Sequence, residues 1–172
     1  MAKKTVLLDT SSAILLYKAN LHELIVDYYH VIIPDSVYSE ITIQNRAGSV
    51  EYSFLCNRKI IWVEQVKENL INYDRELNKL DKGEGDCLKL FLNGIGEFLI
   101  TDDGAAAKYC QANDIHFINA LLVPKILLFS GVDEQKCRSA FSRILAEGRY
   151  SQKVQMFAKN VSTDELKVFL PV

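Results

Sequence analysis

Four short acidic segments carry the side chains of this sequence that are best suited to chemistry. Two of the segments directly follow an apolar run, and the other two lie in stretches that read as helix. Their acids are Asp9, Glu40, the pair Glu84 and Asp86, and the pair Asp102 and Asp103. A carboxylate at the end of a buried strand points into the crevice where open α/β sheets bind ligands. Carboxylates that meet in one place repel one another unless a cation lies among them, so we expect a metal site.

Oxygen ligands from four separate segments suit a hard divalent cation such as Mg²⁺ or Mn²⁺. Mg²⁺ keeps several of its waters and takes only one or two carboxylates directly, so other acids act through water. A cation held in this way polarises a phosphoryl oxygen, activates water and stabilises a leaving alkoxide. Phosphodiester hydrolysis is therefore the reaction that these acids support best.

The composition limits the class of protein. A chain of 172 residues, of which 49% are apolar and 24% charged, is long and apolar enough for one globular domain with its own core. The formal net charge of -2 gives no strong positive field, so any contact with nucleic acid has to come from a local patch. The longest apolar stretches are too short to span a bilayer, and we expect no signal peptide and no membrane partner.

The cysteines indicate the compartment. Cys56, Cys87, Cys110 and Cys137 are widely spaced, and no C-x-x-C pair is present. This spacing favours free thiols over disulfides or a zinc site. We therefore expect a reducing, cytoplasmic location.

Five short β-branched and aliphatic runs predict strands. They are Thr5–Leu8, His30–Ile33, Ile60–Val63, Phe98–Thr101 and His116–Ile118. Helix-like segments lie between them, and this alternation predicts a three-layer α/β/α fold around a five-stranded parallel sheet. Two further helices follow Asp133 outside the alternation. We therefore expect an α/β domain at 1–132 and a C-terminal helical hairpin at 133–172, packed on the same domain.

The acids also carry a resemblance to a known family. Asp-Thr-Ser follows the first strand, Glu40 lies on the third helix, Gly-Glu-x-Asp opens an apolar helix, and Thr-Asp-Asp follows the fourth strand. This order resembles the PIN-domain family, metal-dependent ribonucleases that include the VapC-type toxins of toxin–antitoxin pairs. The matching segments run from about Thr5 to Phe129, and the tail is similar to a subgroup with an extra C-terminal hairpin.

The resemblance implies a sheet order of 3-2-1-4-5, which would put Asp9 beside Asp102 or Asp103 at the switch point. It also implies a Mg²⁺ or Mn²⁺ cofactor, an RNA substrate, a homodimer and a cognate antitoxin. By the same resemblance Asp9 and Asp86 hold the metal. Asp103 (or Asp102) and Glu40 then bind a second ion or position the water.

Two choices between neighbouring acids stay open. The Thr-x-Asp register of the family favours Asp103 as the fourth acid, and whichever of Asp102 and Asp103 is not at the metal is expected to cap the Ala-rich helix. Glu84 and Asp86 are two residues apart on a helix, a rotation of about 200°, so both cannot face one ion. We prefer Asp86, with Glu84 in a supporting position or completing a capping box.

Several neighbours of the acids are candidates for supporting roles. Ser11 matches a small hydroxyl position that helps to hold the first acid or its metal, and Thr101 could orient an acid or a water. We expect Ser11 or Ser12 to cap the first helix. Lys18 and Lys108 could meet RNA phosphates.

Two other folds with acids at strand ends do not match. A receiver domain needs an acidic pair before the first strand, where this chain has Lys3 and Lys4, and a lysine after the fifth, where it has Asn119. A haloacid-dehalogenase-like phosphatase needs Asp-x-Asp after the first strand, where Ser11 stands in the second acidic position. The remaining rival is a PIN-like module that binds RNA or protein without cutting. Metal dependence of an activity would separate it from a nuclease.

Overall fold

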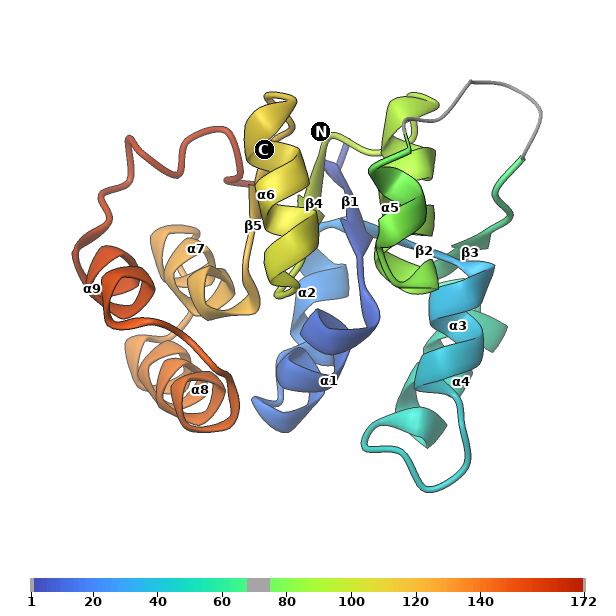
Figure 1. Cartoon of the computed structure of the whole chain (residues 1–172). Coiled ribbons are helices and arrows are strands. Elements are labelled where there is room, and N and C mark those ends of the chain that lie inside the picture. Colours follow the sequence, from blue (N-terminus) through green and yellow to red (C-terminus); the bar gives the residue numbers. More distant parts are fainter. Residues whose placement is uncertain (1, 68–74, 172) are drawn as a thin grey trace.

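The computed structural model describes residues 2–67 and 75–171, and they form an α/β fold around a parallel sheet (Figure 1). The strand order is β3-β2-β1-β4-β5, which confirms the predicted fold class and topology. The strands are β1 (Thr5–Leu8), β2 (His30–Pro34), β3 (Trp62–Glu64), β4 (Phe98–Ile100) and β5 (Phe117–Ile118).

The helices largely follow the expected segments. Those of the α/β part are α1 (Thr10–Lys18), α2 (His22–Tyr28), α3 (Asp35–Ile41), α4 (Ser49–Asn57), α5 (Lys82–Leu92), α6 (Gly104–Ala112) and α7 (Val123–Phe129). Two short 3₁₀ turns, η1 (Leu77–Lys79) and η2 (Ala120–Leu122), precede α5 and α7. Much of the polar segment expected at 69–80 lies outside the described residues.

β3 starts two residues later than predicted. The backbone N–H groups of Ile60 and Ile61 both donate to the carbonyl oxygen of Leu55, at 2.9 and 3.2 Å. These two residues therefore close the end of α4 and cannot pair with β2. Strand pairing begins only at Trp62, opposite Ile32.

The centre of the sheet brings Asp9 to the same level as Thr101, the residue before Asp102. β1 pairs with both β2 and β4, and Leu8 lies opposite Ile100. Asp9 and Thr101 are the next residues of their chains, so they leave the sheet side by side at its carboxyl edge. Val6, Leu7 and Leu8 are fully buried, as expected of a central parallel strand covered on both faces.

The C-terminal helices α8 (Glu134–Glu147) and α9 (Gln152–Asn160) lie beside α7, at the β5 end of the molecule (Figure 1). Cys137, Ala140 and Ile144 of α8 are buried in the same hydrophobic core as the sheet. The chain then returns to the sheet, where the Tyr29 hydroxyl donates to the Phe169 carbonyl oxygen at 2.6 Å. The expected division at residue 132 stays a prediction, although the two parts share one core.

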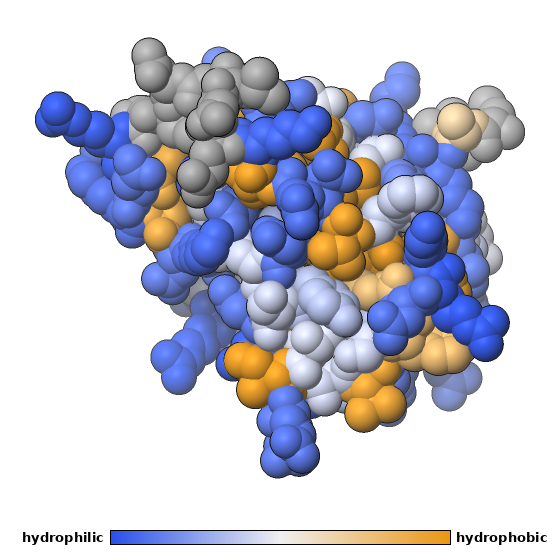
Figure 2. Space-filling view, turned by 90° about the vertical axis from the view of Figure 1, so that its right-hand side faces the viewer, coloured by the Kyte–Doolittle hydropathy of each residue, from blue (hydrophilic) through white to orange (hydrophobic). Residues whose placement is uncertain are grey.

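The face over α3, α4 and β3 carries apolar side chains among polar ones (Figure 2). Six large apolar residues of this region are exposed, namely Ile43, Val50, Phe54, Ile60, Trp62 and Val63. We call these six the α4–β3 surface. Among the described residues, no helix is long and apolar enough to cross a membrane.

Candidate functional site

Asp9 lies at the carboxyl end of β1 and is 1% exposed. Its Oδ1 accepts hydrogen bonds from the Ser12 backbone N–H at 2.8 Å and from the Ser11 hydroxyl at 3.1 Å. Asp9 is thus the N-cap of α1, and the expectation that Ser11 or Ser12 caps this helix is wrong, because both lie within it. Asp9 Oδ2 is buried and has no hydrogen-bond partner among the described residues. Half of this carboxylate is therefore left for another ligand.

Asp102 lies next to Asp9 and is held by three donors. Its Oδ2 accepts from the Ser12 hydroxyl at 2.6 Å and from the Ala120 backbone N–H at 3.1 Å. Its Oδ1 accepts from the hydroxyl of Tyr150, in the segment between α8 and α9. The three donors come from α1, η2 and the C-terminal hairpin, so the fold fixes this carboxylate from three directions.

Burial shifts the pKa values of both acids, and repulsion by Asp102 adds to the shift of Asp9. Burial raises the pKa of Asp9 to about 6, and the charge of Asp102 acts in the same direction. The neighbouring Thr101 hydroxyl and the Ser12 groups lower it in part. Burial also raises the pKa of Asp102, against its hydrogen bonds from Ser12, Tyr150 and Ala120. A cation between the two acids would reverse these shifts.

Glu84 faces the same group of acids from the first turn of α5. Burial raises its pKa to about 7, and the charges of Asp9, Asp103 and Asp81 raise it as well. Asp81 is the N-cap residue of α5, but within the described chain its side chain makes no capping hydrogen bond. The negative charges of Asp9 and Asp103 therefore act on the Glu84 carboxylate.

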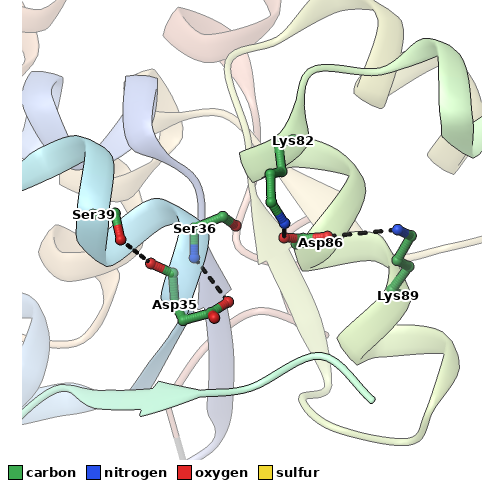
Figure 3. Close-up of polar contacts among 6 residues, drawn as sticks. All are labelled: Asp35, Ser36, Ser39, Lys82, Asp86 and Lys89. Atoms are coloured by element: carbon green, nitrogen blue, oxygen red, sulfur yellow. Dashed lines mark hydrogen bonds and ion pairs between the residues drawn. The ribbon is translucent and has the colours of Figure 1, made fainter. Parts of the chain in front are cut away.

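Asp86 is buried on the same helix and forms ion pairs with two lysines (Figure 3). Lys82 Nζ lies 2.8 Å from Asp86 Oδ2, and Lys89 Nζ lies 3.6 Å from Oδ1. Figure 3 shows this ion pair on the side of α5 that faces Asp35 and Ser36 at the start of α3. The two lysines explain how an acid is accommodated on so apolar a helix.

Asp103 has a structural task of its own at the end of β4. It is the N-cap of α6, and its Oδ1 accepts from the Ala106 backbone N–H at 2.7 Å. The Thr101 hydroxyl accepts from the Asp103 backbone N–H at 3.3 Å. Asp103 is therefore the acid that caps the Ala-rich helix, whereas Asp102 is the acid nearest Asp9.

Glu40 reaches the same edge of the sheet from α3. The Thr10 hydroxyl donates to Glu40 Oε2 at 2.6 Å. A Cβ atom at Gly83 would lie 3.4 Å from Glu40 Oε1 and 3.2 Å from Val37 Cγ2. The glycine thus lets the start of α5 approach α3 closely, and Glu40 lies at this junction.

The two lysines expected to meet RNA lie apart from each other. Lys18, at the end of α1, forms an ion pair with Glu147 of α8 at 2.5 Å. Lys108 is exposed on α6 and lines a groove together with Glu76 and Tyr109. Lys108 lies on α6, the helix that Asp103 caps, so it is the better placed of the two lysines to contact RNA at the acids. The role of both lysines as RNA contacts stays a prediction.

The acids lie near one another, but their side chains are not arranged as a complete set of metal ligands. Within residues 2–67 and 75–171, no three acidic, histidine or cysteine side chains are placed to hold one ion. Serine, tyrosine, lysine and backbone donors occupy many of the acceptor positions of these carboxylates. The donor set nevertheless fits a hard divalent cation: it consists of carboxylate oxygens, and the buried Asp9 Oδ2 lacks a partner. Burial is the main cause of the raised pKa values of Asp9 and Glu84, and the charges of neighbouring acids add to it.

Sequence reasoning missed the contacts of four residues in this arrangement, Lys82, Lys89, Ser12 and Tyr150. Lys82 and Lys89 stand four residues before and three after Asp86, the spacing at which helical side chains meet, so their ion pair could have been read from the sequence. Ser12 was considered only as a helix cap. Tyr150 gave no signal, because its approach to Asp102 depends on how the hairpin folds back.

Comparison with known proteins identifies the family. A family model described as a PIN domain matches residues 5–158, which include α8 and most of α9 as well as the whole α/β part. No curated protein and no solved structure matches the chain. The family match covers most of the sequence and agrees with the strand order and the acids at the strand ends. The chain therefore belongs to the PIN-domain family.

Proposed function

We propose that this protein is an endoribonuclease that depends on Mg²⁺ or Mn²⁺. The observation that carries the proposal is the oxygen Asp9 Oδ2, which is buried beside a second carboxylate and has no hydrogen-bond partner among the described residues. Leaving a buried acceptor unsatisfied costs on the order of 1–3 kcal/mol, and more when the group is charged. Such an oxygen is uncommon in a purely structural site, and it is available as a ligand for a hard cation.

We assign the metal-holding role first to Asp9 and Asp102, which share Ser12 as a hydrogen-bond donor. As the metal ligand from α5 we favour Glu84, because the charges of Asp9 and Asp103 raise its pKa. Asp86 already forms ion pairs with two lysines. Asp103 and Glu40 complete the acidic edge, and their expected role, to bind a second ion or position the water, stays a prediction. Asp86 is the alternative from α5, and the variants described below separate the two.

The proposed chemistry is hydrolysis of an RNA phosphodiester by water. A divalent cation, when bound, supplies Lewis-acid polarisation of the phosphoryl oxygen and lowers the pKa of water. Glu40 or Asp103, the acids not assigned first to the metal, would position the attacking water and accept its proton. Asp9 and Asp102 keep the reacting edge negatively charged and in place. By analogy with the family, the product carries a 5′-phosphate.

A role as the toxin of a toxin–antitoxin pair is part of the proposal, with a homodimer and an antitoxin as partners. The α4–β3 surface supports a protein partner, since exposed apolar side chains gather there on α4, β3 and their flanking turns. RNA would approach the acidic edge, with Lys108 on α6 as a phosphate contact. Lys18 remains a weaker candidate because Glu147 already pairs with it.

Cleavage of a mixed single-stranded RNA pool tests the proposal. The purified protein is incubated with Mg²⁺, Mn²⁺ or EDTA, beside Asp9→Asn. Asp133→Asn is the matched control, because Asp133 caps α8 through Oδ1 just as Asp9 caps α1, and Asn is an equally good cap. We expect cleavage by wild type and Asp133→Asn that requires metal, and none by Asp9→Asn.

Two other results would contradict the proposal. RNA binding without cleavage under every metal condition would favour the non-cutting module. Cleavage that persists in EDTA or in Asp9→Asn would show that the activity does not depend on this site.

A further inference from the structure

The segment between α8 and α9 places Tyr150 on the Asp102 carboxylate. The Tyr150 ring is half-buried, and its hydroxyl donates to Asp102 Oδ1. The Tyr150 carbonyl oxygen in turn accepts from Gln155 Nε2 of α9 at 2.9 Å. The tyrosine is therefore anchored at its backbone by the hairpin and at its hydroxyl by the acid.

Gly148 makes room for this placement. A Cβ atom at residue 148 would lie 2.2 Å from Cε2 of the Tyr150 ring, a distance that forces something to move. Gly148 has an ordinary negative φ of -84°, so the backbone conformation does not require glycine. The glycine matters here because it has no side chain. The Lys18–Glu147 ion pair also ties the end of α8 to α1 next to this segment.

The number of hydrogen bonds that each Asp102 oxygen accepts indicates the role of Tyr150. A carboxylate has two oxygens with about four acceptor positions in all. The Ser12 hydroxyl and the Ala120 N–H both use Oδ2, which fills that oxygen. Among the described residues, Tyr150 is the donor on Oδ1, so this oxygen keeps one position for a further ligand. The tyrosine thus sets how the carboxylate is turned relative to Asp9.

We infer that Tyr150 is a positioning residue for the metal site: it holds Asp102 Oδ1 so that its free acceptor position is available to a cation shared with Asp9. This inference rests on the proposed function. It assigns the C-terminal hairpin a part in the acidic site, to which none of its residues contributes a carboxylate. Outer partners of metal ligands orient them, and removing one typically weakens metal binding tenfold or more.

The opposite role, a latch, makes a different prediction. A latch would occupy Asp102 in competition with the cation, and its removal would tighten metal binding. Positioning is favoured because three donors from three elements agree on one orientation of the carboxylate, and because Tyr150 leaves one acceptor position on Oδ1 open.

The test is the affinity for Mn²⁺ of full-length wild type and Tyr150→Phe, measured by electron paramagnetic resonance of the free ion. The matched control is Tyr29→Phe, which removes another largely buried hydroxyl, donated to the Phe169 carbonyl oxygen away from the acids. We expect at least tenfold weaker binding by Tyr150→Phe and unchanged binding by Tyr29→Phe. In an Asp102→Asn background, Tyr150→Phe should cause no further loss, because the tyrosine acts through Asp102.

The outcomes separate this inference from the proposed function. Wild type that binds Mn²⁺, with equal or tighter binding by Tyr150→Phe, overturns the inference alone. An equal loss in Tyr29→Phe also overturns it, since the effect would then be one of general packing. Wild type that binds no Mn²⁺ overturns the inference and the proposed function together.

Discussion

Asp9 and Asp102 are joined through one residue, Ser12, which donates its backbone N–H to Asp9 Oδ1 at 2.8 Å and its hydroxyl to Asp102 Oδ2 at 2.6 Å. The first contact is a helix cap, and the second crosses from α1 to the end of β4. The two acids are thus held at a fixed separation by the first turn of α1. This arrangement keeps two negative charges together that would otherwise move apart.

The first prediction concerns the pH dependence of stability without metal. Asp9 binds its proton more tightly in the folded protein, because its pKa is about 6 there against 3.8 ordinarily. The free energy of unfolding should therefore fall as pH rises from about 4 to about 6, by roughly 3 kcal/mol from Asp9. The raised pKa of Glu84 extends the decline towards pH 7. Urea denaturation at a series of pH values measures it.

The Asp9→Asn variant is the control for this decline. It removes the buried charge, so its free energy of unfolding should depend less on pH, and above pH 6 the metal-free variant should be the more stable protein. A wild-type stability that rises steadily from pH 4 to pH 7 would contradict the assignment of Asp9 as a strained, buried carboxylate.

The second prediction separates the two acids of α5. Glu84→Gln should abolish RNA cleavage with little loss of stability, since Glu84 is half-buried and repelled by its neighbours. Asp86→Asn should lower the free energy of unfolding by about 1–2 kcal/mol, because it breaks the ion pair with Lys82 and Lys89. Thermal unfolding and cleavage are measured on both variants.

The contrast between these variants decides which acid serves the reaction. If Asp86→Asn folds normally and loses all cleavage while Glu84→Gln stays active, Asp86 is the acid that faces the substrate. The family resemblance would then be the better guide than the electrostatics of the folded chain.

The third prediction concerns Gly148. The Gly148→Ala substitution should displace the Tyr150 ring, since the new Cβ would lie 2.2 Å from it. Its Mn²⁺ affinity should fall about as far as that of Tyr150→Phe, and the double variant should show no additional loss. Isothermal titration of the three variants measures this. Additive losses would mean that Gly148 acts on the site by another route.

Much of the fold could be predicted because its signals are local. The run Thr5–Leu8 is apolar and ends in an acid, and the observed β1 has the same bounds. The Gly-Glu-x-Asp segment was expected to open an apolar helix, and it lies at the start of α5. The strand order came from the family resemblance, since alternation predicts a parallel sheet but not the order of its strands.

The features that the sequence did not predict depend on contacts that local sequence patterns do not reveal. The start of β3 was misplaced because Ile60 and Ile61 bond back to Leu55, which their β-branched side chains do not reveal. The grouping of Asp9 with Asp102 could be expected from strands that end at one edge. The contact of Tyr150 with Asp102 could not, because it depends on the path of the C-terminal hairpin.

The most direct test of the acidic site is a calorimetric titration of the metal-free protein with Mn²⁺ at pH 7.5. We predict saturable binding by wild type and Asp133→Asn and no binding by Asp9→Asn. Proton release on binding should be small at pH 7.5 and larger at pH 6, where Asp9 and Glu84, with pKa values of about 6 and about 7, retain protons. Equal binding by Asp9→Asn, or no binding by wild type, would contradict the account of Asp9 as the centre of a metal site.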